Sequence, residues 1–183
     1  MLQPMHITEY CIRELIKPGD TVIDATAGNG NDTLKLCQAV GKDGRVYAFD
    51  IQKAALENTQ KRLTEANMDN YVLILDSHAN IGRYVSAPVK AAVFNLGYLP
   101  GGDHSIHTNA QTTSQAISAA LELISADGFV SVCIYYGKNS GTMEKDGILD
   151  FLKQLDPKKY TVTLHDFYNR PNNPPLTAII TVI

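Results

Sequence analysis

Short apolar runs alternate with amphipathic stretches along almost the whole chain. The runs, each bounded by turn residues, predict seven strands at residues 21–24, 46–50, 71–75, 90–94, 128–136, 160–167 and 176–183. Between them, apolar positions at helical spacing predict helices at residues 8–17, 33–40, 52–68, 110–125 and 142–155. Thr8 would cap the first helix. This alternation predicts a three-layer α/β fold with a seven-stranded, mostly parallel sheet and an antiparallel final strand.

The composition fits one globular domain that spans residues 1–183, with an apolar content of 44%. No apolar stretch reaches the roughly 18 residues of a membrane span, and the amino terminus lacks the pattern of a signal peptide. Cys11, Cys37 and Cys133 are odd in number and fall inside predicted helices or a strand, so we expect them to be buried and reduced. These features predict a cytoplasmic protein. Because Cys and His residues do not cluster, we expect no metal site.

The charge balance limits the partners. The net charge is −3, whereas nucleic-acid-binding domains usually carry a basic excess that neutralises phosphates. Composition alone therefore favours a small molecule, or a substrate with a small footprint. Contacts with RNA would have to be local, and the candidates for them are Arg83, Lys138, Lys158, Lys159 and Arg170.

A glycine-rich turn follows the first strand. The strand ends at Asp24, and Gly28-Asn-Gly30 then leads into the second helix. A doubly wound sheet binds nucleotide-like ligands with this arrangement, at the carboxyl ends of its strands. The next strand ends at Asp50, 20 residues past Gly30, a spacing that suits a carboxylate accepting hydrogen bonds from ribose hydroxyls. The alternative is a structural turn whose glycines serve packing alone.

Two cofactors use this arrangement, a dinucleotide such as NAD and S-adenosylmethionine (SAM). The dinucleotide pattern G-x-G-x-x-G/A requires a small third residue for helix–strand packing, and Thr33 stands there instead. The acid at Asp24 and the pattern Asp-x-x-x-Gly-x-Gly resemble motif I of class I SAM-dependent methyltransferases. SAM carries no phosphate, so polar side chains such as Asn29, Asn31 and Asp32 suit it better than a stripped glycine loop. The sequence therefore favours SAM.

A polar, glycine-rich segment follows the fourth strand, where a second substrate would meet the cofactor. It begins Asn95-Leu-Gly-Tyr98 and includes Asp103, His104 and His107. In enzymes that methylate exocyclic amines, an Asn/Asp-Pro-Pro-aromatic motif binds the amine and stacks on the base, and Asn95 and Tyr98 have the analogous offsets. The other interpretation is a plain turn in which Tyr98 covers the core. An amine acceptor could lose its proton to Asp103, His104 or His107, or to water.

Three phrases carry a closer resemblance: Asp24-Ala-Thr-Ala-Gly-Asn-Gly-Asn-Asp32, Asn95-Leu-Gly-Tyr-Leu-Pro-Gly101 and Asn169-Arg-Pro-Asn-Asn-Pro-Pro175. The chain resembles, nearly end to end, the YtqB-like (MnmM) family, long described as rRNA methylases. Characterised members methylate the aminomethyl group of a modified wobble uridine in tRNA. The resemblance implies a Rossmann-like class I methyltransferase fold, SAM as cofactor and the anticodon region of tRNA as substrate. The oligomeric state stays open, with a homodimer as one option.

The resemblance and the strand ends together suggest site residues. Those expected to bind SAM are Asp24, Gly28, Asn29, Gly30, Asn31, Asp50, Gln52, Ser77, His78 and Asn95. Asn95 and Tyr98 would position the acceptor, and Asp103 or His104 would assist proton removal. Ser77 is equally well explained as a helix cap. Cys133, in mid-strand, is expected to be inert.

The sequence thus predicts a SAM-dependent RNA N-methyltransferase that modifies 5-aminomethyluridine at the tRNA wobble position. One alternative is an rRNA or small-molecule methyltransferase, the latter favoured by the acidic composition. Another is an NAD-binding oxidoreductase, or a non-catalytic binder with the same fold. Stabilisation by NAD without a response to SAM would favour this last group.

Overall fold

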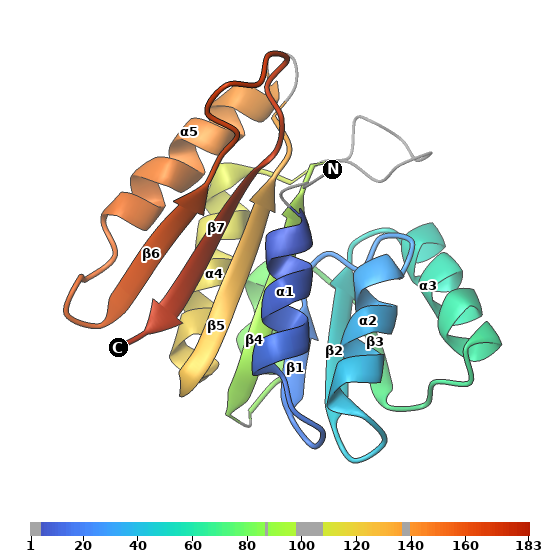
Figure 1. Cartoon of the computed structure of the whole chain (residues 1–183). Coiled ribbons are helices and arrows are strands. Elements are labelled where there is room, and N and C mark those ends of the chain that lie inside the picture. Colours follow the sequence, from blue (N-terminus) through green and yellow to red (C-terminus); the bar gives the residue numbers. More distant parts are fainter. Residues whose placement is uncertain (1–4, 87, 98–107, 137–139) are drawn as a thin grey trace.

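The computed structural model describes residues 5–86, 88–97, 108–136 and 140–183 (Figure 1). Its centre is a seven-stranded sheet in the order β3-β2-β1-β4-β5-β7-β6. The strands are β1 (Thr21–Asp24), β2 (Arg45–Asp50), β3 (Tyr71–Leu75), β4 (Val89–Leu96), β5 (Ile124–Ile134), β6 (Tyr160–His165) and β7 (Leu176–Val182). β7 is antiparallel to both of its neighbours, and the remaining pairs are parallel. The predicted α/β fold with an antiparallel final strand is confirmed.

Helices cover both faces of the sheet. They are α1 (Met5–Leu15), α2 (Asn31–Val40), α3 (Lys53–Glu65), α4 (Ala110–Leu123), α5 (Ser140–Lys153) and the short 3-10 helix η1 (His78–Arg83). In Figure 1, α1 and α2 lie in front of the sheet and α4 lies behind it. Apolar side chains of α1 and α2 pack on one face, while those of α4, α5 and η1 pack on the other. The central strands are buried on both faces, which explains why their apolar runs are continuous.

The strand order reverses at β1. This strand pairs with β2 on one side and with β4 on the other, and all three run in the same direction. Beyond its carboxyl end, the backbone amide of Ala25 donates to the carbonyl of Val93 and that of Ala27 donates to the carbonyl of Phe49. The chain after β1 therefore separates the ends of β2 and β4. Doubly wound sheets bind ligands in the crevice at such a reversal point.

Several details differ from the sequence-based expectations. Thr8 does not cap α1, because the helix begins at Met5 and the buried Thr8 hydroxyl lies 2.7 Å from the Ser131 hydroxyl. The predicted helix over 110–125 ends at Leu123, since Ile124 is already extended and pairs with Val89. Tertiary strand pairing overrides local helix propensity there. η1 was not predicted. All three cysteines are free and buried, as expected. No helix in the described part of the chain is long and apolar enough to cross a membrane.

Candidate functional site

A cavity of about 960 Å³ lies at the carboxyl ends of the parallel strands. Of the residues predicted from sequence, it is lined by Gly28, Asn29, Asn31, Asp50, Gln52, Ser77, His78 and Asn95. Asp24 and Gly30 lie behind its wall, outside the described lining. Tyr98, Asp103, His104 and His107 fall outside the described residues. The fold thus brings together most of the predicted positions that the structure describes.

The cavity also has walls that the sequence-based assignment missed. These are chiefly Thr26, Lys35, Ile51, Arg62, Asp76, Thr108, Asn109 and Thr112. Thr26, Ile51 and Asp76 each follow within two residues of a strand's last residue, as does Tyr135, which the end of the fifth predicted strand already indicated as a border of the acceptor pocket. These residues could therefore have been predicted from their positions directly after the predicted strands. Lys35, Arg62 and Thr112 come from helices, where nothing in the sequence indicates which side faces the ligand.

Helix α3 holds the glycine-rich turn in place. The Thr59 hydroxyl donates to the carbonyl of Gly28 over 3.0 Å, and Nε of Arg62 donates to the carbonyl of Asn29 over 2.7 Å. Gly30 has a φ of +76°, and a Cβ at this position would lie 2.9 Å from the Cα of Thr59. Gly30 therefore serves both the left-handed turn and the close approach of α3.

Two amides of the glycine-rich turn already have partners. The Gly28 amide donates to Oδ2 of Asp50 over 3.0 Å, and the Gly30 amide donates to the Ala27 carbonyl over 2.8 Å. The carboxylate of Asp32 already occupies the first turn of α2 and lines the cavity. An anion bound at this helix start would meet that negative charge, whereas a dinucleotide site leaves the amides open for the pyrophosphate.

Asp50 stands at the end of β2 with its carboxylate fixed at both oxygens. Oδ2 accepts from the Gly28 amide, and Oδ1 accepts from the Gln52 amide over 2.8 Å. Each carboxylate oxygen has a second lone pair, so the pair can still accept hydrogen bonds from a ligand in the cavity. The side chain is therefore held in a defined orientation before any ligand binds.

Asp24 supports the turn from beneath. Its side chain is fully buried, and it accepts hydrogen bonds from the Thr33 hydroxyl over 2.6 Å and from the Thr26 amide over 3.1 Å. Burial disfavours the charged form and raises the pKa of Asp24 to about 7, against the opposing effect of the Thr33 hydrogen bond. Asp24 ties β1 to the start of α2, and in the described structure it does not reach the ligand space.

The end of β3 supplies another wall. Nδ1 of His78 lies 3.1 Å from the carbonyl oxygen of Ala25, so this nitrogen must carry the proton. Burial lowers the pKa of His78, which leaves a neutral ring whose Nε2 can accept a hydrogen bond. Ser77 accepts from the Ala79 amide over 3.2 Å and caps η1. Ser77 therefore fits both interpretations made from the sequence, the helix cap and the ligand-binding residue, because it caps η1 and also lines the cavity.

The side of the cavity formed by β4 and β5 presents an amide and a phenol. Nδ2 of Asn95 donates to Oδ2 of Asp32 over 2.6 Å, and Oδ1 of Asp32 lies 2.9 Å from Nζ of Lys35. Lys35 also bridges to Glu9 on α1 over 2.7 Å. Burial raises the pKa of the Tyr135 phenol, so that this side chain stays protonated. Asn95 is thus held by a chain of charged groups that begins outside the cavity.

The base of the segment after β4 is closed by a reciprocal pair of hydrogen bonds. The Gly97 amide donates to the Thr108 hydroxyl over 3.0 Å, and the Thr108 amide donates to the Gly97 carbonyl over 3.2 Å. Asn109 follows and caps α4 by accepting from the Thr112 amide over 3.0 Å. These bonds fix where the chain leaves β4 and where it enters α4, at the margin of the cavity.

Comparison with known proteins places the chain in a family. The sequence model described as "Putative rRNA methylase" matches residues 46–181. The chain belongs to this family. A second model, the ubiE/COQ5 methyltransferase family, matches residues 7–82. The two matches together span the glycine-rich turn and the seven strands, except for the last residue of β7.

Three relatives of this rRNA methylase family are informative. A crystal structure described as a "putative rRNA-methylase" from Clostridium thermocellum is 48% identical, with a TM-score of 0.98, and the match covers 100% of this chain and 99% of that one. A "putative methyltransferase" from Streptococcus mutans, crystallised in complex with SAH, is 38% identical with a TM-score of 0.92 and coverage of 100% and 99%. The chloroplastic tRNA (mnm(5)s(2)U34)-methyltransferase of Arabidopsis thaliana is 38% identical over 174 residues. That match covers 89% of this chain but only 64% of the plant protein.

Proposed function

We propose that this protein is a SAM-dependent N-methyltransferase that methylates the aminomethyl group of 5-aminomethyluridine at the wobble position of tRNA. The observation that carries the proposal is the cavity itself, which brings the fixed carboxylate of Asp50 and the fixed amide of Asn95 to either side of the β1 turn. The side of the cavity that holds Asp50 then suits the adenosine of SAM, and the side that holds Asn95 suits an amine acceptor. The proposal treats residues 1–183 as one domain acting in the cytoplasm, as a monomer or a homodimer.

The polar groups of the cavity fit SAM better than a dinucleotide. Its described wall carries the carboxylates of Asp32, Asp50 and Asp76 against the cations of Lys35 and Arg62. SAM brings a sulfonium and an ammonium, whereas NAD brings a pyrophosphate that would meet the carboxylate of Asp32 in the first turn of α2. At about 960 Å³ the cavity is at the upper end of the range of ligand pockets, with room for a second reactant.

Residues of the chain can be matched to parts of the cofactor. Asp50 would accept hydrogen bonds from the ribose hydroxyls, and Ile51, an exposed apolar side chain in the lining, would cover one face of the adenine. Ser77 and the acceptor nitrogen of His78 lie where the base edge would be read. Gly28, Asn29 and Asn31 would meet the amino-acid end. When bound, SAM supplies a methyl group activated by a sulfonium.

The acceptor side is suited to a neutral amine. Asn95 presents its carbonyl oxygen away from Asp32, since its NH₂ group donates to that carboxylate. An amine that donates one hydrogen to this oxygen would have its lone pair directed for in-line attack, which is the main demand of a methyl displacement. An ammonium must first lose a proton. We propose Tyr98 for stacking on the base and Asp103 or His104 for proton removal, all outside the described residues.

The choice of substrate rests on the relatives. The plant enzyme that shares 38% identity is named for wobble uridine of tRNA, and the family carries an rRNA methylase description. Both names point to RNA. We favour the tRNA amine because Asn95 presents an acceptor for amine hydrogens, and because the described cavity lining contains no thiol for carbon methylation. Cys133, the residue before the last one of β5, is buried and lies outside that lining.

A direct test compares cofactors before substrates. Calorimetric titration of the protein with SAM, SAH and NAD should give saturable binding of SAM and SAH and no measurable binding of NAD. Transfer of a labelled methyl group to bulk tRNA from cells that cannot complete this wobble modification should follow. Binding of NAD in place of SAM would overturn the proposal. Transfer to rRNA or to free amines, with tRNA unlabelled, would keep the methyltransferase and change its substrate.

A further inference from the structure

The connection between β6 and β7, residues 166–175, lies at the same edge of the sheet as the cavity. Ile134, the last residue of β5, pairs with Leu176, the first residue of β7, and His165 pairs with Thr177. Tyr135, which follows Ile134 directly, lines the cavity. Figure 1 shows the connection reaching the upper edge, to which the parallel strands also point. The segment is therefore continuous with the margin of the site.

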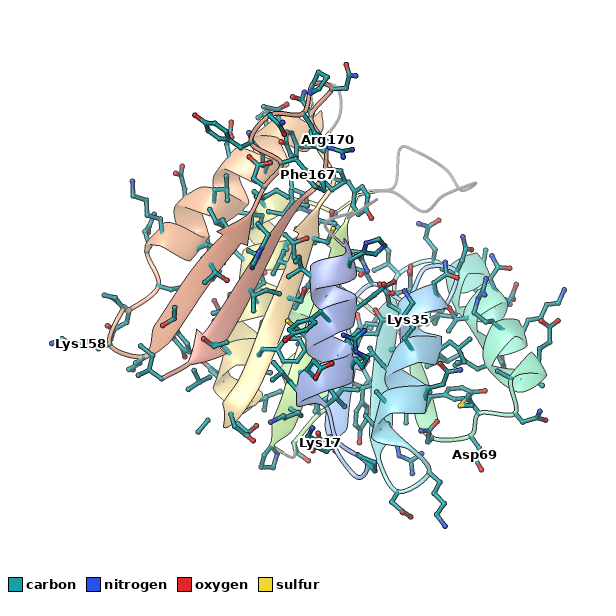
Figure 2. The ribbon with its side chains drawn as sticks, in the orientation of Figure 1. Lys17, Lys35, Asp69, Lys158, Phe167 and Arg170 are labelled. Carbon is teal, nitrogen blue, oxygen red and sulfur yellow. The ribbon has the colours of Figure 1, made fainter. Side chains whose placement is uncertain are left out.

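This segment is braced by its own side chains. The guanidinium carbon of Arg170 lies 4.9 Å from the centre of the Phe167 ring, and the Arg170 amide donates to the Phe167 carbonyl over 3.2 Å. Figure 2 shows the two side chains together at the upper edge. Asn172 and Asn173 both have positive φ, and Pro171, Pro174 and Pro175 restrict the backbone around them. The turn therefore has little conformational freedom to lose on binding a partner.

Tyr168 is the exposed feature on this rigid turn. Its side chain is fully exposed, the most exposed large apolar group among the described residues. A ring left in water contributes nothing to the core, whereas an aromatic surface is what a nucleobase stacks on. The segment holds one acid, Asp166, and one base, Arg170, so it is not a basic patch. Residues 166–175 are therefore suited to stacking on a base, with one cation nearby.

We propose that residues 166–175 bind a single-stranded nucleotide of the RNA substrate, next to the nucleotide whose base enters the cavity. Tyr168 stacks on the base, and Arg170, held over Phe167, contacts the flanking phosphate. The proposal rests on the proposed function, because only a polymer substrate leaves neighbouring nucleotides outside the pocket. It also explains how a chain of net charge −3 binds RNA: the contact is short and largely aromatic.

The structure separates two other cationic candidates, Lys158 and Lys159, from this surface, whereas Lys138 lies outside the described residues. Lys158 and Lys159 precede β6, and Tyr160 pairs with Val182 at the opposite end of the hairpin. Figure 2 places Lys158 at the far left of the view, well below Arg170. Lys158→Gln therefore removes one positive charge, as Arg170→Gln does, but from the opposite end of the β6–β7 hairpin. Tyr10, half-exposed on α1 with Arg13 over its ring, provides the same pair of side chains at another place.

The test measures binding of a fluorescent anticodon stem-loop RNA by anisotropy, together with methyl transfer to tRNA and calorimetric affinity for SAM. Tyr168→Ala should weaken RNA binding about tenfold, the scale of one lost stacking contact, and Tyr168→Phe should restore it. Arg170→Gln should weaken binding and flatten its dependence on salt. SAM affinity and thermal stability should not change in these variants, and Tyr10→Ala and Lys158→Gln should bind RNA like the wild type.

Two results would contradict the proposal that residues 166–175 bind RNA. The first is an RNA affinity of Tyr168→Ala equal to that of the wild type. The second is a loss of RNA affinity in Tyr10→Ala as large as that in Tyr168→Ala. The first result would mean that Tyr168 contacts a protein partner or no partner at all. Wild-type methyl transfer to tRNA reports on the proposed function, whereas the ratio of variant to wild-type RNA affinity reports on residues 166–175. The two proposals can therefore fail separately.

Discussion

Asn95, at the end of β4, donates its side-chain NH₂ to the carboxylate of Asp32 in the first turn of α2, over 2.6 Å. A carboxylate can only accept, so the contact defines which end of the amide faces it. The carbonyl oxygen of Asn95 is then left for a donor in the cavity. Lys35, which pairs with the other oxygen of Asp32, holds that carboxylate in place. Asp32 thus acts on the acceptor through Asn95.

This relationship predicts that substitutions of Asn95 and Asp32 have non-additive effects on the rate of methyl transfer. Asn95→Ala should reduce single-turnover methyl transfer about 100-fold, the scale of a misaligned reactant, with SAM affinity nearly unchanged. Asp32→Ala should cost about tenfold, because the amide remains but is free to turn. The double variant should be close to Asn95→Ala alone. If the two losses multiply instead, Asp32 does not work through Asn95.

Asp50 should contribute to cofactor affinity. Asp50→Ala removes a charged acceptor and leaves the amides of Gly28 and Gln52 without their partner. We expect SAM binding to weaken by about 2–3 kcal/mol, as for a lost hydrogen bond to a charged group, when measured by calorimetry. Asp43→Ala, an exposed acid in the turn before β2, is the control for net charge. Unchanged SAM affinity in Asp50→Ala would refute the ribose assignment.

Gly30 can be tested against two other glycines. Gly30→Ala combines a left-handed backbone with a Cβ 2.9 Å from the Cα of Thr59, so unfolding by urea should show a loss of about 2–4 kcal/mol. Gly19→Ala has a φ of +93° and open space, so it isolates the backbone strain. Gly82→Ala has neither feature and should cost little. Equal losses at Gly30 and Gly19 would show that the contact with Thr59 is not limiting.

The buried carboxyl of Asp24 predicts a pH dependence of stability. Its pKa rises from 3.8 to about 7 on folding, so between these values the folded state keeps a proton that the unfolded chain has released. The free energy of unfolding contributed by Asp24 therefore falls as pH rises from about 4 to about 7, and is constant above. Asp24→Asn, which can still accept from Thr26 and bond to Thr33, should lack this slope.

The measurement is urea unfolding of the wild type and Asp24→Asn at about pH 5 and pH 7.5. The wild type should lose stability relative to the variant at the higher pH. Burial lowers the pKa of His78, which acts in the opposite direction in acid, but this residue is common to both proteins and cancels in the difference. Parallel curves would mean that Asp24 is not protonated in the folded state near neutral pH.

The fold was largely predictable because strands and helices differ in the spacing of their apolar residues. All seven strands and five helices were predicted near their observed positions. Apart from η1, which was not predicted, the errors lie at element boundaries. Ile124 joins β5 because it pairs with Val89, and Thr8 lies inside α1 because the helix starts earlier. Such features depend on contacts between distant segments, which local pattern does not contain.

The candidate site shows the same division. Acids and amides at strand ends, such as Asp50 and Asn95, could be found from sequence because parallel strands end at one edge. The inward side of a helix could not, so Lys35 and Arg62 were missed. Asp24 looked like a ligand-binding acid, yet burial and its bonds to Thr33 and Thr26 place it behind the cavity wall. Only the packing of α2 against β1 reveals that.

The most direct measurement is mass spectrometry of tRNA nucleosides after incubation of aminomethyluridine-bearing tRNA with the protein and methyl-labelled SAM. The account predicts one labelled methyl group on the aminomethyl nitrogen of the wobble uridine. With Asn95→Ala in place of the wild type, a single-turnover reaction of the same length should give only a small fraction of that label, in line with transfer slowed about 100-fold. Label on another nucleoside would contradict the proposed substrate. Bound SAM with no label in tRNA under conditions that label rRNA or a free amine would contradict the central claim.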